Sequence, residues 1–228
     1  MADVKGMPSW VLIGDLVGSR RSADRLGTHD LLVRVLAEVN EASARAGRTD
    51  GALQITAGDE FQGTFPSLGA AIATTLRVRT ALLPDADVRC GIGFGHVLVL
   101  QEAPRVEDGP GWWAARSAIN AVAADAARSA LHGLRTRYAV APESEADHRR
   151  IGGGPDPAAV NAALMVRDHL VSSLSPRSLS VLRGLLARQA QKDIARDLGI
   201  SPSAVSQRVR ADGLAVLVAT DELLGGLG

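Results

Sequence analysis

The chain has 228 residues, a hydrophobic content of 46% and 25 basic against 25 acidic residues. This length fits one large or two small domains, and the apolar content is enough for a real core, which argues against a disordered chain. A net charge of zero excludes a general polyanion binder, so any surface for nucleic acid must be local.

Secreted and membrane-spanning proteins are also not expected. Cys90 is the only cysteine, so the chain cannot form an intramolecular disulfide, which fits a reducing cytoplasm. The first residues lack an apolar core of signal-peptide length, and no apolar run approaches a membrane span. We therefore expect a cytoplasmic protein without a membrane partner.

From residue 10 to about residue 140, strand-like and helix-like segments alternate. Their order predicts an α+β domain over 1–141, with a palm or ferredoxin-like sheet and helices on one face of it. The predicted strands lie at 10–17, 52–56, 60–65, 86–94, 97–101 and 137–141, with a turn at Gly95-His96, and the predicted helices at 28–46, 66–83 and 111–130.

The remaining chain has a different pattern. Proline, glycine and charged residues dominate 142–157, which predicts a linker. Beyond it, the apolar spacing is helical throughout and predicts an all-α domain over 158–228. Its expected helices lie at 158–174, 176–187, 191–198, 202–211 and 214–224.

Carboxylates stand at two strand ends of the first domain. Asp15 interrupts the β-like run, and Asp59 and Glu60 lie at the tip of the predicted hairpin. Two carboxylates on neighbouring strands could bind Mg²⁺, and Mg²⁺ could in turn bind a phosphate. The alternative is that Asp15 caps a turn and Asp59 completes a hairpin corner.

The segment 191–208 has the spacing of a helix-turn-helix. Ala195 is small enough for a close helix crossing, Gly199 lies where the turn needs a positive φ, and Ser201 can cap the second helix. The alternative is a helical hairpin that only packs or dimerises. Because one small module of near-neutral charge binds DNA weakly, we expect a homodimer. The candidate DNA-contacting residues are Gln191, Ser203, Ser206, Gln207, Arg208 and Arg210.

Several short strings give family resemblances. The last fifty or so residues resemble sigma-factor-region-four and LuxR-type helix-turn-helix modules. The strings at 15–19, 58–61, 89–95 and 111–116 occur in the order and approximate spacing of class III nucleotide cyclases, and Gly-Asp-Glu-Phe at 58–61 is similar to the diguanylate cyclase signature. Taken whole, the chain resembles the SatD family.

The cyclase resemblance implies roles for individual residues. It implies that Asp15 and Asp59 hold metal ions and that Arg116 contacts the transferring phosphate. Glu60 is a further metal candidate, and the ligand and phosphate candidates are Gly18, Ser19, Arg20, Gly58, Trp112 and Arg116.

Two positions depart from the cyclase pattern. Ile55 stands where such cyclases have a purine-selecting lysine, and Trp112 stands where an asparagine positions the ribose. Because lost orienting groups cost orders of magnitude in rate, this favours a DNA-binding transcriptional regulator. Its degenerate cyclase-like domain would sense a nucleotide or another phosphorylated ligand with Mg²⁺. The alternatives are a divergent Mg²⁺-dependent nucleotide cyclase or nucleotidyltransferase with a helical accessory domain, or a pair of protein-interaction modules.

Overall fold

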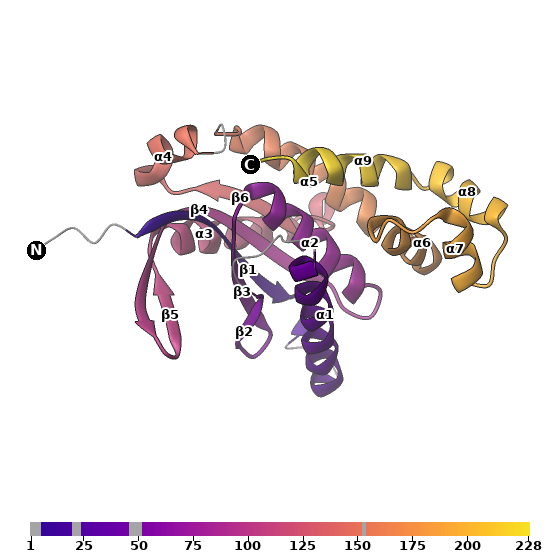
Figure 1. Ribbon diagram of the computed structural model, residues 1–228, viewed down its shortest axis with the longest axis horizontal. Coiled ribbons are helices and arrows are strands. Elements are labelled where there is room, and N and C mark those ends of the chain that lie inside the picture. Colours follow the sequence, from indigo (N-terminus) through magenta and orange to yellow (C-terminus); the bar gives the residue numbers. More distant parts are fainter. Residues whose placement is uncertain (1–5, 20–23, 46–51, 152–153) are drawn as a thin grey trace, which may run out of the picture.

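The N-terminal half is a mixed α+β sheet whose strands follow a β-α-β-β-α-β order (Figure 1). The computed structural model describes residues 6–19, 24–45, 52–151 and 154–228. Neighbouring strands in the order β2-β3-β1-β4-β5 are antiparallel, and β6 pairs with β4 in parallel. The strands are β1 (Met7–Leu16), β2 (Gln54–Ala57), β3 (Glu60–Phe65), β4 (Val88–Glu102), β5 (Arg105–Asp108) and β6 (Thr136–Val140).

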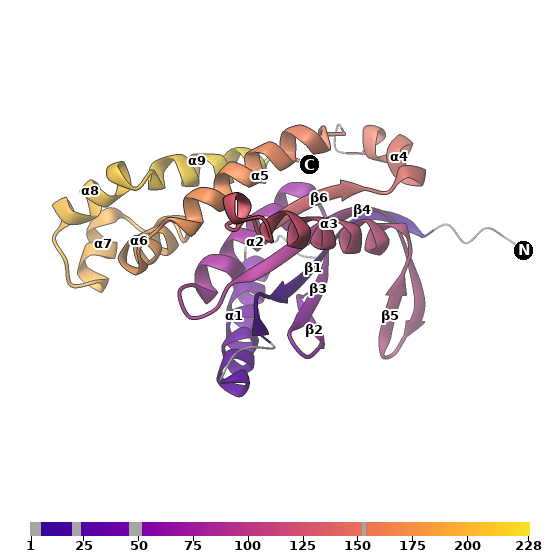
Figure 2. The ribbon, with the colours of Figure 1, turned by 180° about the vertical axis from the view of Figure 1, so that it is seen from behind.

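Helices cover both faces of this sheet, whereas the sequence predicted one covered face. Along β1, Trp10 and Leu12 join the core beneath α1 (Arg25–Arg45) and α2 (Leu68–Leu82). Val11 and Ile13 instead pack against α3 (Pro110–Ala126) on the opposite face, which is in front in Figure 2. A strand buried on both faces is apolar at every position, so β1 shows no alternation to reveal its sides.

The predicted turn at Gly95-His96 is absent, because β4 runs through it as one strand. The extension of β1 to Met7 supplies partners there, since Ser9 pairs with Gly95 and Pro8 pairs with His96. Beyond this point β4 pairs with β5, a strand that the sequence pattern did not predict.

Glycines in β4 allow a close approach of α3. A Cβ atom at Gly91 would lie 2.2 Å from the carbonyl oxygen of Ala115, and one at Gly93 would lie 2.2 Å from that of Gly111. No residue other than glycine fits at these two positions, so the backbone of α3 packs directly on the backbone of β4. This contact fixes the height of α3, and therefore of Arg116, above the sheet.

The expected linker contains two short helices, η3 (Pro142–Ser144) and α4 (Glu145–Arg150), and a buried His148. Tyr138 and His148 are joined by a hydrogen bond of 2.7 Å. The following helices are α5 (Pro157–Ser172), α6 (Pro176–Leu186), α7 (Gln191–Asp197), α8 (Pro202–Ala211) and α9 (Leu214–Gly225).

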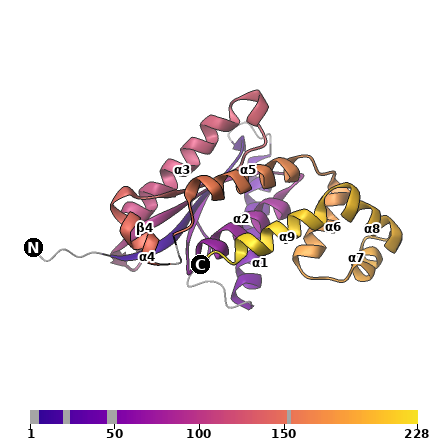
Figure 3. The same ribbon diagram turned by 90° about the horizontal axis from the view of Figure 1, so that it is seen from above.

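These C-terminal helices share their cores with the sheet half. Val160, Leu164 and Leu224 belong to the core cluster of β1, α1 and α2, and Leu76 of α2 belongs to the cluster of α6–α9. In Figure 3, α5 and α9 run close to α2 while α6, α7 and α8 extend beyond the sheet. No helix in the described part of the chain is long and apolar enough to cross a membrane.

A buried polar network joins the two halves of the chain. Asp168 is 1% exposed, accepts hydrogen bonds from the backbone nitrogens of Arg135 and Thr136 at 2.8 and 2.6 Å, and forms an ion pair with Arg79 at 3.3 Å. Arg167, also 1% exposed, donates to the carbonyl oxygen of Ile72 at 3.2 Å. Buried charges need such partners, so α5 is anchored to α2 and β6.

Candidate functional site

Three neighbouring strands bring charged side chains to one end of the sheet. The register places Asp15 of β1 opposite Glu60 of β3 on one side and opposite Arg89 of β4 on the other. Arg89 forms a bidentate ion pair with Asp15, from Nε to Oδ1 at 3.0 Å and from Nη2 to Oδ2 at 2.7 Å. Arg116 of α3 does the same with Glu60, at 2.7 Å for both contacts.

Asp59 lies at the turn between β2 and β3, where Gly58 has a φ of +64°. Its carboxylate accepts a hydrogen bond from the hydroxyl of Ser19, which follows β1. Ser19, Gly58 and Asp59 line a cavity of about 330 Å³ together with residues from the first turn of α1. The predicted ligand positions at 15–19 and 58–60 are therefore brought to the same end of the sheet.

The charges of Asp59 and Glu60 act on the Asp15 carboxyl. Burial raises the pKa of Asp15 above its ordinary value, the Arg89 guanidinium opposes this, and the charges of Asp59 and Glu60 raise it further. Because two carboxylates and burial disfavour ionisation of Asp15, a cation placed among these groups would relieve that cost.

The Asp15 carboxyl gives a pH-dependent stability. Its raised pKa means that its contribution to folding is present at acidic pH and is lost as pH rises through the folded-state pKa. We therefore expect Asp15→Asn to gain stability relative to the parent chain as pH increases from about 3.5 to 7. Urea unfolding at several pH values measures this difference. Asp30→Asn, an exposed carboxyl on α1, is the control and should give a small, nearly constant difference; a falling Asp15→Asn difference would contradict the assignment.

Two predicted ligand residues, Trp112 and Arg20, are not seen at this cluster. Trp112 is 7% exposed and packs in the core with Val11 and Ile13, away from the carboxylates, so its contact with a ligand stays a prediction. Trp113, 59% exposed, donates instead to Asp108 at 2.8 Å. Arg20 lies outside the described residues, and Gly18 lies in the turn after β1 with a φ of +75°.

Other residues of this end were missed by the sequence analysis. Arg89 stands opposite Asp15, but only the register of β1 and β4 reveals that pairing. Arg25 and His29 line the cavity beside Asp59, and His29 lies 3.0 Å from the carbonyl oxygen of Gly58 through its Nδ1. The position of a helix start directly after the Asp15 loop could have indicated them.

Single residues elsewhere have local roles. His96, predicted to lie in a turn, is in β4 and contacts the Gly6 carbonyl oxygen at 2.6 Å and Asp147 at 2.9 Å. Cys90 is fully buried, and burial raises its pKa, so it fills the core rather than acting as a nucleophile.

The second predicted site consists of α7, the turn and α8. Gly199 has a φ of +62°, and Ser201 caps α8 by accepting from the backbone nitrogen of Ala204 at 3.1 Å. Arg208 is half-buried and donates to Ser178 at 3.4 Å, and its contact with DNA stays a prediction. Ser206 is half-buried, and the exposed candidates are Gln191, Ser203, Gln207 and Arg210.

A family model decides the relationship of the chain to known proteins. The model of the SatD family matches residues 10–224. The chain belongs to the SatD family. No curated protein sequence matches this SatD-family chain.

Among solved structures, the chain is similar to nucleotide cyclases at low identity. A bacterial light-regulated adenylyl cyclase is 14% identical, with 57% of this chain and 74% of that chain covered and a TM-score of 0.42. The guanylate cyclase domain of RhGC from Catenaria anguillulae in complex with GTP is 18% identical, with 50% and 72% covered and a TM-score of 0.39. The adenylate/guanylate cyclase/hydrolase from Silicibacter pomeroyi is 22% identical, with 49% and 68% covered and a TM-score of 0.38.

Proposed function

We propose that this SatD-family protein binds a nucleoside triphosphate at the Asp15–Asp59 end of the sheet and acts as a divergent metal-dependent nucleotide cyclase or nucleotidyltransferase. The observation that carries the proposal is the convergence of three carboxylates and two arginines on adjoining strand ends and α3. This combination supplies both charge signs that a metal-bound phosphate requires.

The carboxylates have the right chemistry for Mg²⁺. Mg²⁺ prefers oxygen ligands and is commonly held by one or two carboxylates, with water and substrate phosphates completing its shell. Asp15 and Asp59 would be those ligands, with Glu60 beside them. Within the described ranges, no three His, Cys, Asp or Glu side chains are grouped so as to hold a metal on their own, so the phosphate would have to complete the site. When bound, the cation would neutralise charge on the phosphates.

The surrounding groups favour an anionic ligand. Arg116 has an exposed fraction of 47% and is held in place by Glu60, so its guanidinium is both accessible and oriented. The first turn of α1 faces the cavity beside Asp59 and contributes Arg25. A helix N-terminus carries a partial positive charge, which suits a phosphate, and at α1 the Asp24 carboxylate accepts from the backbone nitrogen of Gly27 at 2.8 Å.

The chain's own groups suggest slow chemistry. In a nucleotidyl transfer, a hydroxyl oxygen attacks the α-phosphorus and pyrophosphate leaves, so charge develops on the phosphate oxygens. Arg116 would stabilise that charge. Ile55 has no polar group, and the indole nitrogen of Trp112 is buried, so neither side chain is available to orient the base or the ribose. We therefore expect turnover well below that of an efficient cyclase.

The deciding experiment measures Mg²⁺-dependent binding first and turnover second. ATP and GTP are titrated against the full chain with and without Mg²⁺ or Mn²⁺, and thermal unfolding is followed. A triphosphate at a hundred times its Kd should add about 2.7 kcal/mol to the free energy of unfolding. Product analysis on the same samples then identifies a cyclic or linear product. Absence of any metal-dependent stabilisation would overturn the proposal.

DNA binding by α8 is the second candidate function. It is favoured by one specific arrangement: a capped helix follows a glycine turn and leaves Ser203, Gln207 and Arg210 exposed. Short polar and arginine side chains on such a helix can reach base edges and phosphates. Because the chain has no net charge, two copies would be needed for tight binding, so this candidate includes a homodimer.

The DNA-binding candidate makes a separate prediction. After selection of sites from a random DNA pool, Gln207→Ala should weaken binding by about 1–3 kcal/mol at one base position. Arg210→Ala should weaken binding to all sequences and lower the salt slope by about one. Arg177→Ala, an exposed arginine on α6, is the control. If no sequence is enriched, or if both variants bind like the parent, α8 is not a recognition helix.

A further inference from the structure

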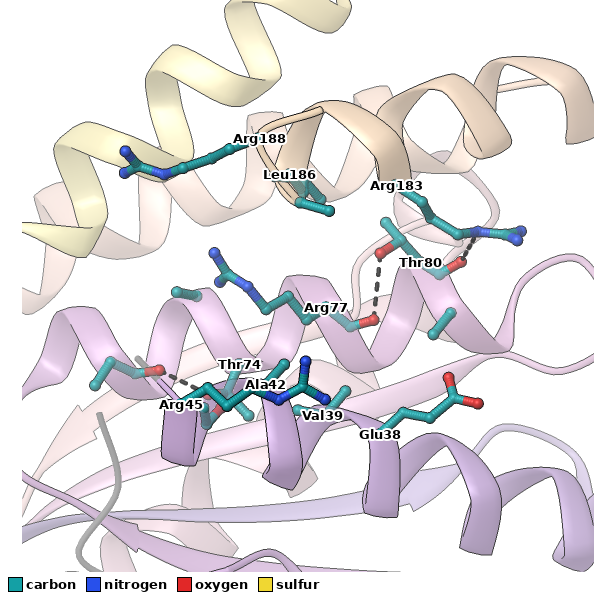
Figure 4. A pocket seen from close by; sticks show the side chains of 15 residues that line it. Glu38, Val39, Ala42, Arg45, Thr74, Arg77, Thr80, Arg183, Leu186 and Arg188 are labelled. Atoms are coloured by element: carbon teal, nitrogen blue, oxygen red, sulfur yellow. Dashed lines mark hydrogen bonds between the residues drawn. The ribbon is translucent and has the colours of Figure 1, made fainter. Parts of the chain in front are cut away.

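A groove of about 550 Å³ lies between α1, α2 and α6, far from the carboxylate cluster (Figure 4). The cluster adjoins the first turn of α1, whereas the groove includes Arg45, its last residue. Since α1 has 21 residues, its two ends are separated by roughly 30 Å. The groove is therefore a second, independent cavity.

The surface of the groove is largely aliphatic. Its walls include Val39 and Ala42 of α1, Ala73 of α2 and Leu186 of α6. Thr74 and Thr80 also line it, but their hydroxyls donate to carbonyl oxygens within α2, at 2.8 Å in both cases. None of the described lining residues is aromatic or carries a side-chain amide.

Arginines surround this aliphatic surface. The lining residues include Arg45, Arg77, Arg183 and Arg188 but only one acid, Glu38, in a chain whose net charge is zero. Arg183 turns away to donate to the carbonyl oxygens of Thr80 and Leu83, at 2.9 and 2.8 Å. In Figure 4, the guanidinium of Arg77 points from α2 towards the wall that carries Leu186 and Arg188. Arg77 also forms an ion pair with Asp221 at 3.5 Å, and Arg45 forms one with Glu41 at 2.9 Å.

Arg188 is held in an unusual backbone conformation. Its φ is +59°, and it is the one non-glycine residue with a positive φ among the residues that the structure describes. Arg188 lies just after α6, and the backbone nitrogen of the next residue, Gln189, donates to the carbonyl oxygen of Gly184 at 2.9 Å. Glycine is the usual residue at this position after a helix. No side-chain hydrogen bond or ion pair of Arg188 is present within the described chain, so no such interaction offsets its strained backbone conformation there.

The groove continues into a second cavity. A space of about 510 Å³ runs past Ser67 and Gly225 and shares Ala70, Ala73 and Arg188 with the first. Arg188 therefore stands where the two spaces meet along α2. A ligand whose charge lies beside Arg188 could extend an apolar chain along the alanines.

We propose that this groove binds an amphipathic organic anion, a carboxylate or phosphate monoester on an unbranched apolar chain. Arg188 receives the anionic group, the ion-paired Arg77 and Arg45 add positive charge to the groove, and the chain lies against Ala42, Ala73 and Leu186. Such a ligand would bridge α1 and α2, which cover the sheet, to α6, which supports α7 and α8. The site is independent of the nucleotide site proposed above.

The test uses decanoate, kept below its micelle concentration, and the full-length protein. Isothermal titration should show saturable binding of decanoate and of decyl phosphate, with much weaker binding of decanol, acetate and inorganic phosphate. Arg188→Gly should raise the Kd for decanoate at least about tenfold. It should also fold at least as stably as the parent, because glycine relieves the positive φ. Ala42→Trp, which replaces an exposed alanine on the groove wall, should block binding.

Matched controls separate the groove from general surface effects. Arg34→Gln removes an exposed arginine of α1 outside the groove, and Ala44→Trp adds an indole on the same helix away from its lining. Both should bind decanoate like the parent. Equal binding of decanol would overturn the anion assignment, and unchanged affinity in Arg188→Gly and Ala42→Trp would overturn the location. Absence of decanoate binding would overturn the proposal as a whole.

Discussion

Replacing Asp168 by asparagine is expected to lower the free energy of unfolding by about 3–5 kcal/mol. The carboxylate is 1% exposed and forms an ion pair with Arg79. It also accepts hydrogen bonds from the backbone nitrogens of Arg135 and Thr136, at the start of β6. Asparagine has nearly the same shape but no charge, and its amide group cannot accept where a carboxylate oxygen did. The loss therefore leaves buried guanidinium groups with less compensation.

For a chain of this size, the loss corresponds to a fall in Tm of roughly 6–20 °C. Calorimetry of the variant and of Glu222→Gln, which removes an exposed carboxylate of α9, measures it. The control should change by less than about 0.5 kcal/mol. A fall below about 1 kcal/mol in Asp168→Asn would contradict the role of the network.

The same network predicts a single unfolding transition. Because α5 is bonded to α2 and β6 and the core clusters mix residues of both halves, the C-terminal helices should not unfold separately from the sheet. Two resolved calorimetric transitions would show instead that residues 158–228 behave as an independent unit.

The second large effect concerns the proposed nucleotide site. If Asp59 is a ligand of the cation, Asp59→Asn should lower metal-dependent turnover by about 10²–10³-fold, equivalent to roughly 3–4 kcal/mol of lost transition-state stabilisation. Asparagine is suited to the same hairpin turn, so the backbone beside Gly58 should be retained. Asp15→Asn should have a comparable effect.

Stability, binding and product are measured in parallel for these variants. Glu102→Gln, which removes a carboxylate on the β4–β5 hairpin that is 79% exposed, should keep the activity of the parent. Arg116→Gln should weaken phosphate recognition without removing the metal-dependent stabilisation by Mg²⁺ and triphosphate entirely. Full turnover in Asp59→Asn would place the chemistry elsewhere.

Local signals in the sequence predicted much of the fold. The turn and cap residues Gly199, Ser201 and Pro202 defined α8 at 202–211, the same bounds that the structure has. The hairpin around Gly58 was likewise predicted from its own residues. Such signals act over a few residues and do not depend on the rest of the chain.

Features that depend on distant partners could not be predicted. The local sequence at Gly95-His96 predicts a turn, but the extension of β1 supplies strand partners there. The local sequence also leaves Trp112 free to contact a ligand, but the packing of α3 on β1 buries it. Arg89 and Asp15 are 74 positions apart, and their pairing follows only from strand register. The carboxylates at the strand ends of the candidate site could therefore be named from the sequence, whereas the ion pairs that these carboxylates form could not.

The close contact between β4 and α3 has a consequence for mutational scanning. Gly91, Gly93 and Gly95 each face backbone atoms of α3 or of its first turn, so every side chain larger than hydrogen should be selected against at these positions. In a saturation library they would form an alternating series of intolerant sites as pronounced as any ligand-binding residue. Yet these glycines set only the spacing between strand and helix, so intolerance in this protein should be compared with Cβ clearance before any position is assigned to chemistry.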